Sequence, residues 1–468
     1  MRAQDTVDVV VVGGGIAGCV AAARAGELGL SAVVLEAGVD DRYLCNARFS
    51  GGVFHVAFTD VTLPVATLRA AIGTATEGKA DPVQADAIAD NARRLVDWLK
   101  AQGAMFIRTQ VAWQNFILAP PRPIVAGQEW RGRGPDVLLR QLGEKIAARG
   151  GRIDRGARGR TLLIENGRCV GIEAETATGP RRYGARAVIL ADGGYQANLA
   201  RLGAIVANPA SVKQRGAATG VGDGLAMAEQ VGAAISPLHW FYGHLLCRDA
   251  MTNDRVWPYP ELDALAGAGI VVEARGKRVT DEGVGGVSVA NAIAGLPDPL
   301  ATTIVFDAAI WNGPGKSARI PANPTLASAG GTIHSADTLV ELAAKAGLDA
   351  DALVRTVAAY NAAVATQRTS DLDPPRTASR FPPMPITTAP YMAIPIVAGI
   401  TYTMGGVRVD GASRVLRPDG GAIDGLYAAG STTGGLEGGV KAAYVGGLIK
   451  AGVQGLVAAE DIANTLKS

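Results

Sequence analysis

Three glycines near the N-terminus, Gly13, Gly15 and Gly18, carry the clearest chemical signal of the chain, a GxGxxG spacing. The first permits a tight turn, the second lets the backbone approach a pyrophosphate without a Cβ in the way, and the third allows close packing of helix on strand. Glu36 follows at a place where its carboxylate can accept hydrogen bonds from ribose hydroxyls. These residue types in this order predict dinucleotide binding.

The elements around the motif must hold the glycines and the carboxylate in place. Residues Val7 to Val12 read as a buried strand, a helix follows the turn, and a second strand ends at Glu36. The helix directs its unpaired N–H groups and the positive end of its dipole toward the phosphates. A glycine turn alone is common, but strand, turn, helix, strand and acidic residue in sequence predict a Rossmann-type domain.

The rest of the chain alternates helical and strand patterns. Apolar residues at helical spacing predict helices over 85–104 and 136–149. A buried strand, 187–191, ends at a double glycine that resembles a second close approach to a nucleotide. Residues 216–233 form another glycine turn that opens a helix.

The sequence character changes near residue 236, where LHWFYGH is densely aromatic, and a proline-rich stretch, 374–390, reads as a linker. After it, GLYAAG resembles another strand running into a glycine turn, and a glycine-rich helix closes the chain. We therefore predict an α/β fold. One nucleotide-binding domain is built from both chain ends, 1–235 and 386–468, and an α+β domain is inserted at 236–385.

Composition limits the possible classes of protein. At 468 residues the chain can bury two substantial cores, and its formal net charge of +2 gives no argument for nucleic acid or an anionic membrane. No apolar run approaches the roughly 20 residues that span a bilayer, and no signal peptide is apparent. The four cysteines form no CxxC pair, so neither a zinc site nor a disulfide framework is indicated, and a cytoplasmic setting is the simplest expectation.

Five motifs in order carry a family resemblance: GGGIAG, AVILADGGY, ATGVGDGLAMAEQVGA, TMGGVRVD and GLYAAG. Together they resemble the FAD-dependent fumarate reductase and succinate dehydrogenase flavoprotein superfamily, which also holds ketosteroid dehydrogenases and tricarballylate dehydrogenase. The resemblance covers both chain ends and reaches the inserted domain only in patches. It implies an FAD-binding domain with a capping domain, and hydride transfer between flavin N5 and a C–C bond beside a carbonyl or carboxylate.

The resemblance also implies a set of cofactor-binding residues. In the family, the loop after the second strand carries an Asn or Ser and a double glycine beside the flavin, and this loop contains no histidine for covalent attachment. Non-covalent FAD is therefore the prediction. The implied FAD contacts are Gly13, Gly15, Ile16, Ala17, Gly18, Glu36, Ala37, Asn46, Ser50, Gly51, Gly52, Ala191, Gly193, Asp223, Gly405, Gly430, Gly447 and Leu448.

Departures from the fumarate reductase pattern concern the substrate. Gly286 stands where those enzymes have a proton-donating arginine, and Tyr402 where they have a substrate-binding histidine. The arginine that clamps a carboxylate corresponds best to Lys441, which is a point donor rather than a planar fork. These differences predict that the chain is not a fumarate reductase and belongs to the ketosteroid dehydrogenase-like and tricarballylate dehydrogenase-like branch.

The resemblance suggests replacements for the lost groups. Tyr444 and the Gly447 amide resemble the ketosteroid dehydrogenase arrangement that polarises a carbonyl, as an oxyanion hole does. Tyr402 is a candidate acid or base, and His244, at the one family histidine position that survives, is its competitor because its ordinary pKa is roughly 6.5. Lys441 is a further substrate candidate. All four are also compatible with packing or solvent roles, and the aromatic run beside His244 reads as a cavity wall.

These features together predict a non-covalent FAD oxidoreductase. It would act as an ene-reductase or dehydrogenase on the C–C bond α,β to a carbonyl, in a compact and rather apolar small molecule, with an unidentified electron donor or acceptor. One alternative is a flavin amine or amino-acid oxidase. Another is a flavin-carrying electron-transfer subunit of a multi-protein complex, because the chain has no haem or cluster ligands of its own.

Overall fold

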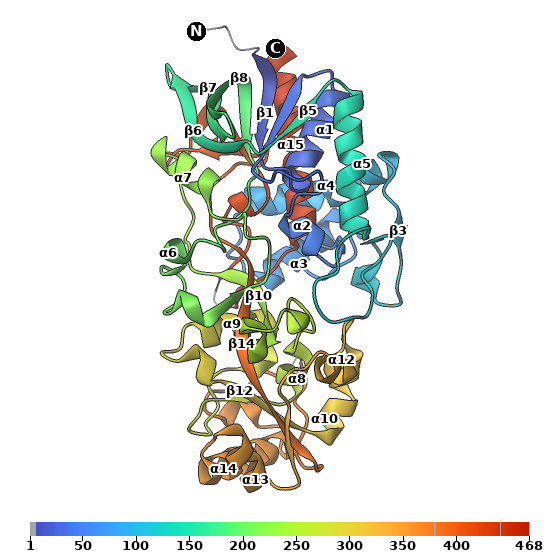
Figure 1. Ribbon diagram of the computed structural model, residues 1–468, viewed down its shortest axis with the longest axis vertical. Coiled ribbons are helices and arrows are strands. Elements are labelled where there is room, and N and C mark those ends of the chain that lie inside the picture. Colours follow the sequence, from blue (N-terminus) through green and yellow to red (C-terminus); the bar gives the residue numbers. More distant parts are fainter. Residues whose placement is uncertain (1–5, 379–380, 440, 468) are drawn as a thin grey trace.

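Buried apolar strands form the centre of the upper part of the molecule in the computed structural model, which describes residues 6–378, 381–439 and 441–467 (Figure 1). Val9, Val10 and Val11 are completely buried, as expected for a parallel strand covered on both faces. Within the described residues this sheet has eight strands: β1 (Val7–Val12), β2 (Ala32–Glu36), β5 (Arg152–Arg155), β6 (Arg158–Glu165), β7 (Arg168–Thr176), β8 (Gly179–Leu190), β15 (Arg414–Leu416) and β16 (Ala422–Ala428).

The order of these strands brings the two chain ends together. The sheet runs β15-β16-β8-β1-β2-β5, and β6 and β7 extend it as an antiparallel meander from β8. Strand β1 is parallel to β2 and to β8, and β16, from the C-terminal end of the chain, is parallel to β8. Parallel strands put their carboxyl ends at one edge of the sheet, where ligands of such folds bind.

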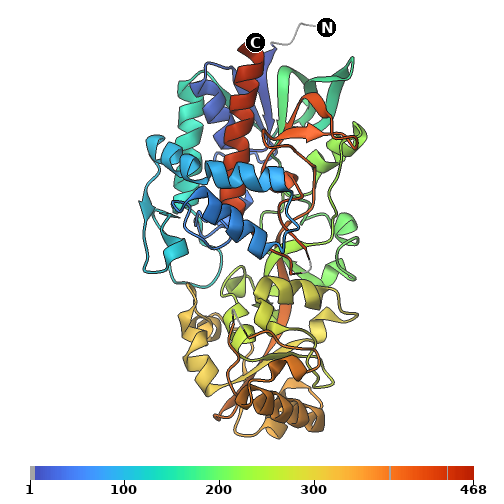
Figure 2. The same ribbon diagram turned by 180° about the vertical axis from the view of Figure 1, so that it is seen from behind.

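Helices cover this sheet and fill the space below it. Helices α1 and α15, blue and red in Figure 1, lie side by side, and a Cβ at Gly455 would fall 2.3 Å from the Ala17 carbonyl oxygen, so only glycine permits this approach. Figure 2 shows α4 crossing α15 on the other side. The helices are α1 (Ile16–Glu27), α2 (Asn46–Phe49), α3 (Val65–Ala75), α4 (Pro82–Ala101), α5 (Gly134–Ala148), α6 (Leu199–Leu202), α7 (Asp223–Gln230) and α15 (Gly447–Lys467).

A second sheet forms the lower part, and the thirteen-residue strand β14 is its axis (Figure 1). Strand β14 pairs with β10, β12 and β13, which belong to the inserted segment 236–385. It also pairs with β9, which belongs to the N-terminal segment 1–235. The strands are β9 (Val212–Gln214), β10 (Phe241–Cys247), β11 (Ile270–Val272), β12 (Thr303–Asp307), β13 (His334–Ala336) and β14 (Tyr391–Thr403). A separate small pair joins β3 (Phe106–Ile107) to β4 (Ile117–Leu118).

Short helices surround the second sheet. They are α8 (Asp263–Ala268), α9 (Gly286–Ala294), α10 (Ala308–Asn312), α11 (Pro314–Ser317), α12 (Ala322–Ser328), α13 (Leu339–Ala346) and α14 (Ala350–Ala365). The predicted α/β class with a Rossmann-type part from both chain ends and an inserted α+β part is confirmed. The exact boundaries stay a proposal, because β14, which lies inside the predicted segment 386–468, pairs with the second sheet.

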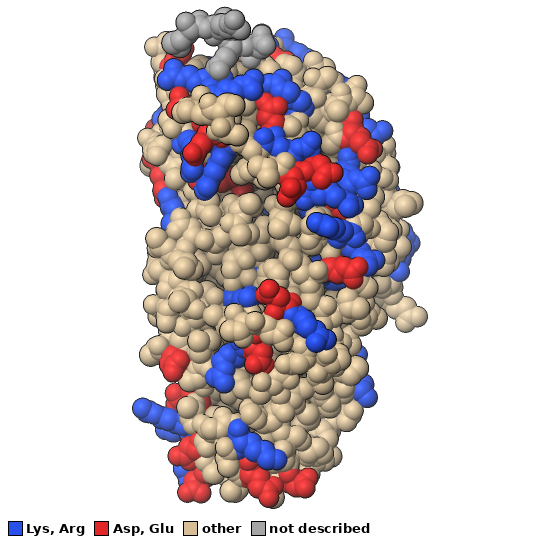
Figure 3. Space-filling model, viewed as in Figure 1, with Lys and Arg blue, Asp and Glu red and all other residues tan. Residues whose placement is uncertain are grey.

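The surface gives no strong electrostatic signal. On the face shown in Figure 3, positive and negative side chains are interspersed over both parts, in keeping with the formal net charge of +2. No helix within the described residues is long and apolar enough to cross a membrane.

Candidate active site

A cavity of about 430 Å³ lies where the two parts meet, and residues from both line it. Most of the sequence-predicted cofactor residues are in its wall: Gly13, Gly15, Ile16, Ala17, Glu36, Ala37, Asn46, Ser50, Gly51, Gly52, Ala191, Gly193, Asp223, Gly430, Gly447 and Leu448. Tyr402, Tyr444 and His244 line it as well. The fold therefore brings together residues that lie hundreds of positions apart in the chain.

The first glycine turn has the form that a pyrophosphate requires. Gly13 has a φ of +103°, and a Cβ there would lie 2.5 Å from the Ala191 carbonyl oxygen. A Cβ at Gly15 would meet nothing within 4 Å, so the space above the turn is open. Gly15 precedes α1, and no side chain of the described residues caps this helix, so the first N–H groups of α1 are available to an anion. These features fit the phosphates of FAD.

Glu36 is held at the cavity wall by backbone donors. It is 5% exposed and accepts hydrogen bonds from the N–H groups of Gly14 and Gly38 at 2.8 and 2.7 Å. Burial raises the pKa of the Glu36 carboxyl, although both backbone hydrogen bonds oppose this. A carboxylate fixed in this way has remaining lone pairs to accept hydrogen bonds from a ribose.

The loop after β2 is joined to two distant segments by Asn46. Its amide donates to the Thr401 carbonyl oxygen at 2.8 Å and accepts from the Ala217 N–H at 2.7 Å. The Ser50 hydroxyl is turned back onto the Ala47 carbonyl at 2.7 Å, and Gly52 has a φ of +73°. Asn46 thus fixes the position of the loop that carries the double glycine.

Three predicted residues lie outside the cavity wall. A Cβ at Gly18 would fall 2.0 Å from the Gly13 carbonyl oxygen, so Gly18 serves the packing of α1 on the turn. A Cβ at Gly405 would fall 2.3 Å from the Pro237 carbonyl oxygen, so Gly405 serves the crossing of two backbone segments. The Lys441 ammonium lies 2.7 Å from a Glu77 carboxylate oxygen, and about half of its side chain (52%) is exposed. Lys441 is therefore not placed as a substrate ligand, because it points to a surface ion pair.

A chain of polar groups lies on the cap side of the cavity. His244 Nδ1 is 2.6 Å from Asp263 Oδ2, and His244 Nε2 is 2.8 Å from the Tyr242 hydroxyl. Asp263 also accepts the Leu245 N–H at 2.9 Å, which fixes its carboxylate. Because a carboxylate only accepts, the Nδ1 atom carries the proton and Nε2 accepts from Tyr242. This is the order of groups that activates a hydroxyl in acid–base catalysis.

Gly286 explains how Asp263 reaches His244. A Cβ at Gly286 would lie 1.9 to 2.3 Å from the carboxylate atoms of Asp263, so any side chain at position 286 would displace the aspartate. The family resemblance predicts an arginine at this position in fumarate reductases, whereas in this chain the missing side chain leaves room for the Asp263 carboxylate.

Tyr444 packs against Tyr242, the first residue of this hydrogen-bonded series. The two rings stack with centroids 4.0 Å apart, and the Tyr444 hydroxyl accepts the Gly447 N–H at 2.9 Å. Burial raises the pKa of the Tyr444 hydroxyl, so it keeps its proton and can donate it. The Gly447 amide acts on Tyr444 in this structure and not directly on the cavity.

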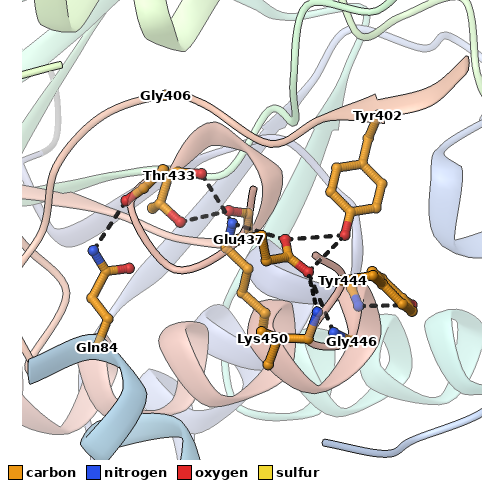
Figure 4. A network of polar contacts seen from close by, with 12 residues as sticks. Gln84, Tyr402, Gly406, Thr433, Glu437, Tyr444, Gly446 and Lys450 are labelled. Carbon is orange, nitrogen blue, oxygen red and sulfur yellow. Dashed lines mark hydrogen bonds and ion pairs between the residues drawn. The ribbon is translucent and has the colours of Figure 1, made fainter. Parts of the chain in front are cut away.

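A buried network lies behind Tyr402 (Figure 4). The Tyr402 hydroxyl is 3.0 Å from both carboxylate oxygens of Glu437, and Lys450 Nζ lies 3.4 Å from the same carboxylate. The backbone N–H groups of Val445 and Gly446 also donate to Glu437. Burial, followed by the Glu437 charge, raises the pKa of Tyr402 well above its usual value. Tyr402 is therefore a fixed hydroxyl that retains its proton.

Two residues of the Tyr242–His244–Asp263 series are not predicted from the sequence as catalytic residues. Tyr242 was interpreted as cavity wall, and Asp263 was not singled out. The alternation of Tyr242 and His244 on strand β10 gave a weak signal, since residues two apart on a strand share one face. Nothing local in the sequence connects Asp263 to them, because it lies beyond a turn at the start of α8.

Comparisons with known proteins identify the family of the chain. A family model described as FAD binding domain matches residues 8–447. The chain belongs to this family. It is an FAD-dependent oxidoreductase that acts on CH–CH bonds, as its relatives are.

The relatives of this flavoprotein include a fumarate reductase and a steroid dehydrogenase. It is 28% identical over 447 residues to a fumarate reductase (cytochrome) of Shewanella frigidimarina, covering 93% of this chain and 73% of that protein. It is 33% identical over 308 residues to a 3-oxosteroid 1-dehydrogenase of Mycobacterium tuberculosis, covering 58% of this chain and 53% of that protein.

Solved structures show the same fold. The flavoprotein matches a 3-ketosteroid Δ4-(5α)-dehydrogenase from Rhodococcus jostii with a TM-score of 0.74 and 22% identity, over 99% of this chain and 98% of that one. It matches a 3-ketosteroid Δ1-dehydrogenase from Sterolibacterium denitrificans with a TM-score of 0.76 and 20% identity, over 99% and 100% of the two chains.

Proposed function

We propose that the flavoprotein oxidises or reduces the C–C bond α,β to a carbonyl of a compact small molecule, with Tyr242 as the acid–base residue. The observation that carries this proposal is the hydrogen-bonded series Tyr242, His244, Asp263 at the cavity wall. FAD, held without a covalent bond, supplies the hydride acceptor or donor. The remaining chemistry is proton transfer and charge stabilisation by the protein.

Proton transfer follows from the order of the three groups. In the oxidising direction Tyr242 takes the proton from the substrate carbon while its own proton passes to His244 Nε2, and His244 becomes an imidazolium. The reducing direction starts from that imidazolium, which returns its Nε2 proton to Tyr242 as Tyr242 gives its own to the substrate carbon. Asp263 stabilises the imidazolium that forms. General acid–base catalysis of this kind contributes about 10²- to 10⁴-fold to the rate.

The substrate carbonyl is assigned to Tyr444. Its hydroxyl accepts from the Gly447 amide, so its own proton remains to be donated to a carbonyl oxygen that gains negative charge. One such donor is worth about 3 kcal/mol to a transition state. The amide therefore positions Tyr444, and the buried carboxylate of Glu437 keeps Tyr402 in its protonated form as a third fixed hydroxyl.

Reoxidation of the reduced flavin tests the reaction class. The holoenzyme is photoreduced without oxygen, and the absorbance near 450 nm is followed as 2-cyclohexenone or fumarate is added. Rapid return of the oxidised spectrum with the enone supports the proposal. Reoxidation by fumarate alone, or steady peroxide formation with amines in air, would contradict it in favour of a dicarboxylate reductase or an amine oxidase.

Tyr242→Phe tests the assigned acid–base residue. Turnover of the enone should fall about 10²-fold or more because the proton source is removed, with FAD content unchanged. Tyr195→Phe is the matched control, because the Tyr195 hydroxyl is buried without a hydrogen-bond partner among the described residues and lies outside the cavity wall. Unchanged turnover in Tyr242→Phe would remove this residue from the mechanism.

The electron partner and the location of the protein are proposals as well. The partners of the chain are a small-molecule substrate and a separate electron donor or acceptor. The four cysteines are free in the structure. We propose a cytoplasmic location from the free thiols. Fractionation of cells that express the full chain tests this, and recovery in the periplasm would contradict it.

A further inference from the structure

A tight turn beside the cavity contains residue types that its backbone disfavours. Val56 and Thr59 exchange both backbone hydrogen bonds, with N···O distances of 3.0 and 2.8 Å. The two central residues, Ala57 and Phe58, both have positive φ, at 46° and 58°. Such two-residue hairpin turns are normally built from Asn-Gly or Gly-Gly, because bulky side chains are strained in the left-handed region. Residues strained in this way gather at functional sites, so the Phe58 ring, which glycine would not provide, is the candidate for a role.

The Phe58 ring belongs to an aromatic cluster with His55 and Trp113. It stacks on His55 with centroids 4.9 Å apart and meets the Trp113 ring edge-on at 5.2 Å. His55 and Trp113 also meet edge-on at 5.2 Å, so each ring of the cluster contacts the other two. The Phe58 N–H donates to His55 Nδ1 at 3.0 Å, which ties the imidazole to the turn. All three side chains line the cavity, and the aromatic cluster is therefore one stretch of its wall.

The aromatic cluster lies against the tyrosine to which the substrate carbonyl is assigned. His55 and Phe58 meet the Tyr444 ring edge-on, with centroids 5.4 and 5.8 Å from it. The Ala57 N–H donates to the Val445 carbonyl oxygen at 2.6 Å, so the turn is joined to the segment that carries Tyr444. The strained turn is consequently fixed at the carbonyl end of the cavity.

The surroundings of the turn keep it from relaxing away from the cavity. Phe54 and Val56 are completely buried, and His55 is 3% exposed. A Cβ at Gly446 would lie 2.5 Å from the His55 carbonyl oxygen, so the two backbone segments are in direct contact. Strained residues persist only where the surrounding structure fixes them in this way.

We propose that Phe58 is a specificity-determining residue, and that the aromatic cluster closes the cavity beside Tyr444 to a second fused ring. The inference rests on the proposed function, because it takes Tyr444 as the carbonyl ligand, and it narrows the substrate class to monocyclic enones or their saturated ketones. Three rings that pack on one another form a stiff wall, whereas a single flexible side chain would move aside. The strained backbone at Phe58 keeps its ring in that wall.

Phe58→Gly tests the proposal, because glycine is the residue type that the turn prefers and the variant loses the ring without added strain. The holoenzyme is assayed with 2-cyclohexenone and with octalone, its fused bicyclic homologue. The ratio of kcat/KM, octalone over 2-cyclohexenone, should rise about 10- to 100-fold in the variant, as room for added methylene groups implies. An unchanged ratio, including a parallel loss of activity with both enones, would overturn the proposal and leave Phe58 a structural residue of the turn.

Ala57→Gly is the matched control for the backbone. It places glycine in the same turn and retains the Phe58 ring, and Ala57 is not among the described residues that line the cavity. The ratio of this variant should equal that of the wild type. An equal rise in Ala57→Gly would assign the effect to the backbone of the turn and overturn the proposal. If Phe58→Gly loses FAD, Phe58→Asn repeats the comparison with the other residue type that tolerates positive φ.

Binding without turnover separates this inference from the reaction class. Phenol and 2-naphthol carry their oxygen on one and two flat rings, and their binding to the oxidised holoenzyme is followed by the perturbation of the flavin spectrum. Phe58→Gly should shift the affinity ratio toward 2-naphthol by about 10-fold or more relative to the wild type. If neither enone reoxidises the reduced flavin, the proposed function fails, and this shift would still support the aromatic wall. If both enones are turned over and neither ratio changes in the variant, the reaction class stands and the role of Phe58 is overturned.

Discussion

At the scale of single residues, the contact between Asp263 and Gly286 decides the chemistry of the site. The carboxylate of Asp263 fills the volume that a Cβ at Gly286 would need. It reaches His244 only because position 286 carries no side chain, and His244 in turn holds Tyr242. A glycine is therefore required for the acid–base series although it contributes no functional group.

Gly286→Ala should lower turnover about tenfold or more, because the methyl group displaces the aspartate and His244 loses its orientation. Turnover number and FAD content measure the effect, and FAD content should not change. Gly295→Ala is the control at the other end of α9, where a Cβ would meet nothing closer than 3.5 Å. A fully active Gly286→Ala enzyme would show that Asp263 does not orient His244.

Asp192 gives a prediction on the pH dependence of stability. Burial raises the pKa of its carboxyl from 3.8 to about 6, although the Gly224 N–H donates to it at 2.8 Å. An acid whose pKa is raised by folding stabilises the protein at low pH and loses this contribution as pH rises. Asp192→Asn should therefore melt higher than wild type at pH 7.5, with the difference shrinking toward pH 4. A difference independent of pH would contradict the raised pKa.

At the scale of elements, the unit β1–α1–β2 builds the nucleotide site from local geometry. Strand β1 ends at the glycine turn, helix α1 begins there without a side-chain cap, and β2 ends at Glu36. The turn, the helix terminus and the carboxylate consequently face one space. The C-terminal helix α15 begins at the same cavity with Gly447, so both chain ends contribute to the site.

Glu36→Ala should lose FAD during gel filtration, because the ribose loses its acceptor and two backbone N–H groups lose theirs. The ratio of flavin to protein absorbance measures this. Glu27→Ala is the control, since Glu27 lies at the other end of α1 in partly exposed ion pairs, which are worth little. Full retention of the yellow cofactor by Glu36→Ala would contradict the ribose assignment.

At the scale of the whole molecule, the cavity lies between the two parts, and the long strand β14 of the second sheet leads to it. Strand β14 starts in the cap sheet and ends at Thr403, beside Tyr402 of the active site (Figure 1). Residues of both parts line the cavity, so a bound cofactor and substrate contact both. Binding should therefore stabilise the chain as a unit.

Added FAD should raise the melting temperature of the apoprotein in a concentration-dependent way. At about 100 times its Kd, a ligand that binds only the folded state adds about 2.7 kcal/mol to the free energy of unfolding. Differential scanning fluorimetry measures the shift, and AMP serves as the control ligand that lacks the flavin. Acid denaturation should release all the flavin into the supernatant, and flavin that stays with the precipitated protein would show a covalent bond.

The sequence by itself determined the nucleotide-binding part, since that site depends on neighbours in the chain. Gly13 and Gly15, α1 and Glu36 follow one another within one supersecondary unit, so their spacing already fixes their geometry. The family resemblance also predicted Tyr402, His244 and Tyr444 as substrate-side residues, and all three line the cavity; Tyr402 directly precedes the motif TMGGVRVD.

Only the tertiary structure decided the substrate side. Asp263 reaches His244 from a different element, Lys441 turns to Glu77, and Arg319 enters the cavity from the cap. These outcomes depend on the packing of β10, β14 and the cap helices, which no local pattern encodes. The role of a side chain there depends on which distant residues pack against it and which charges lie near it. Only the folded chain fixes those neighbours.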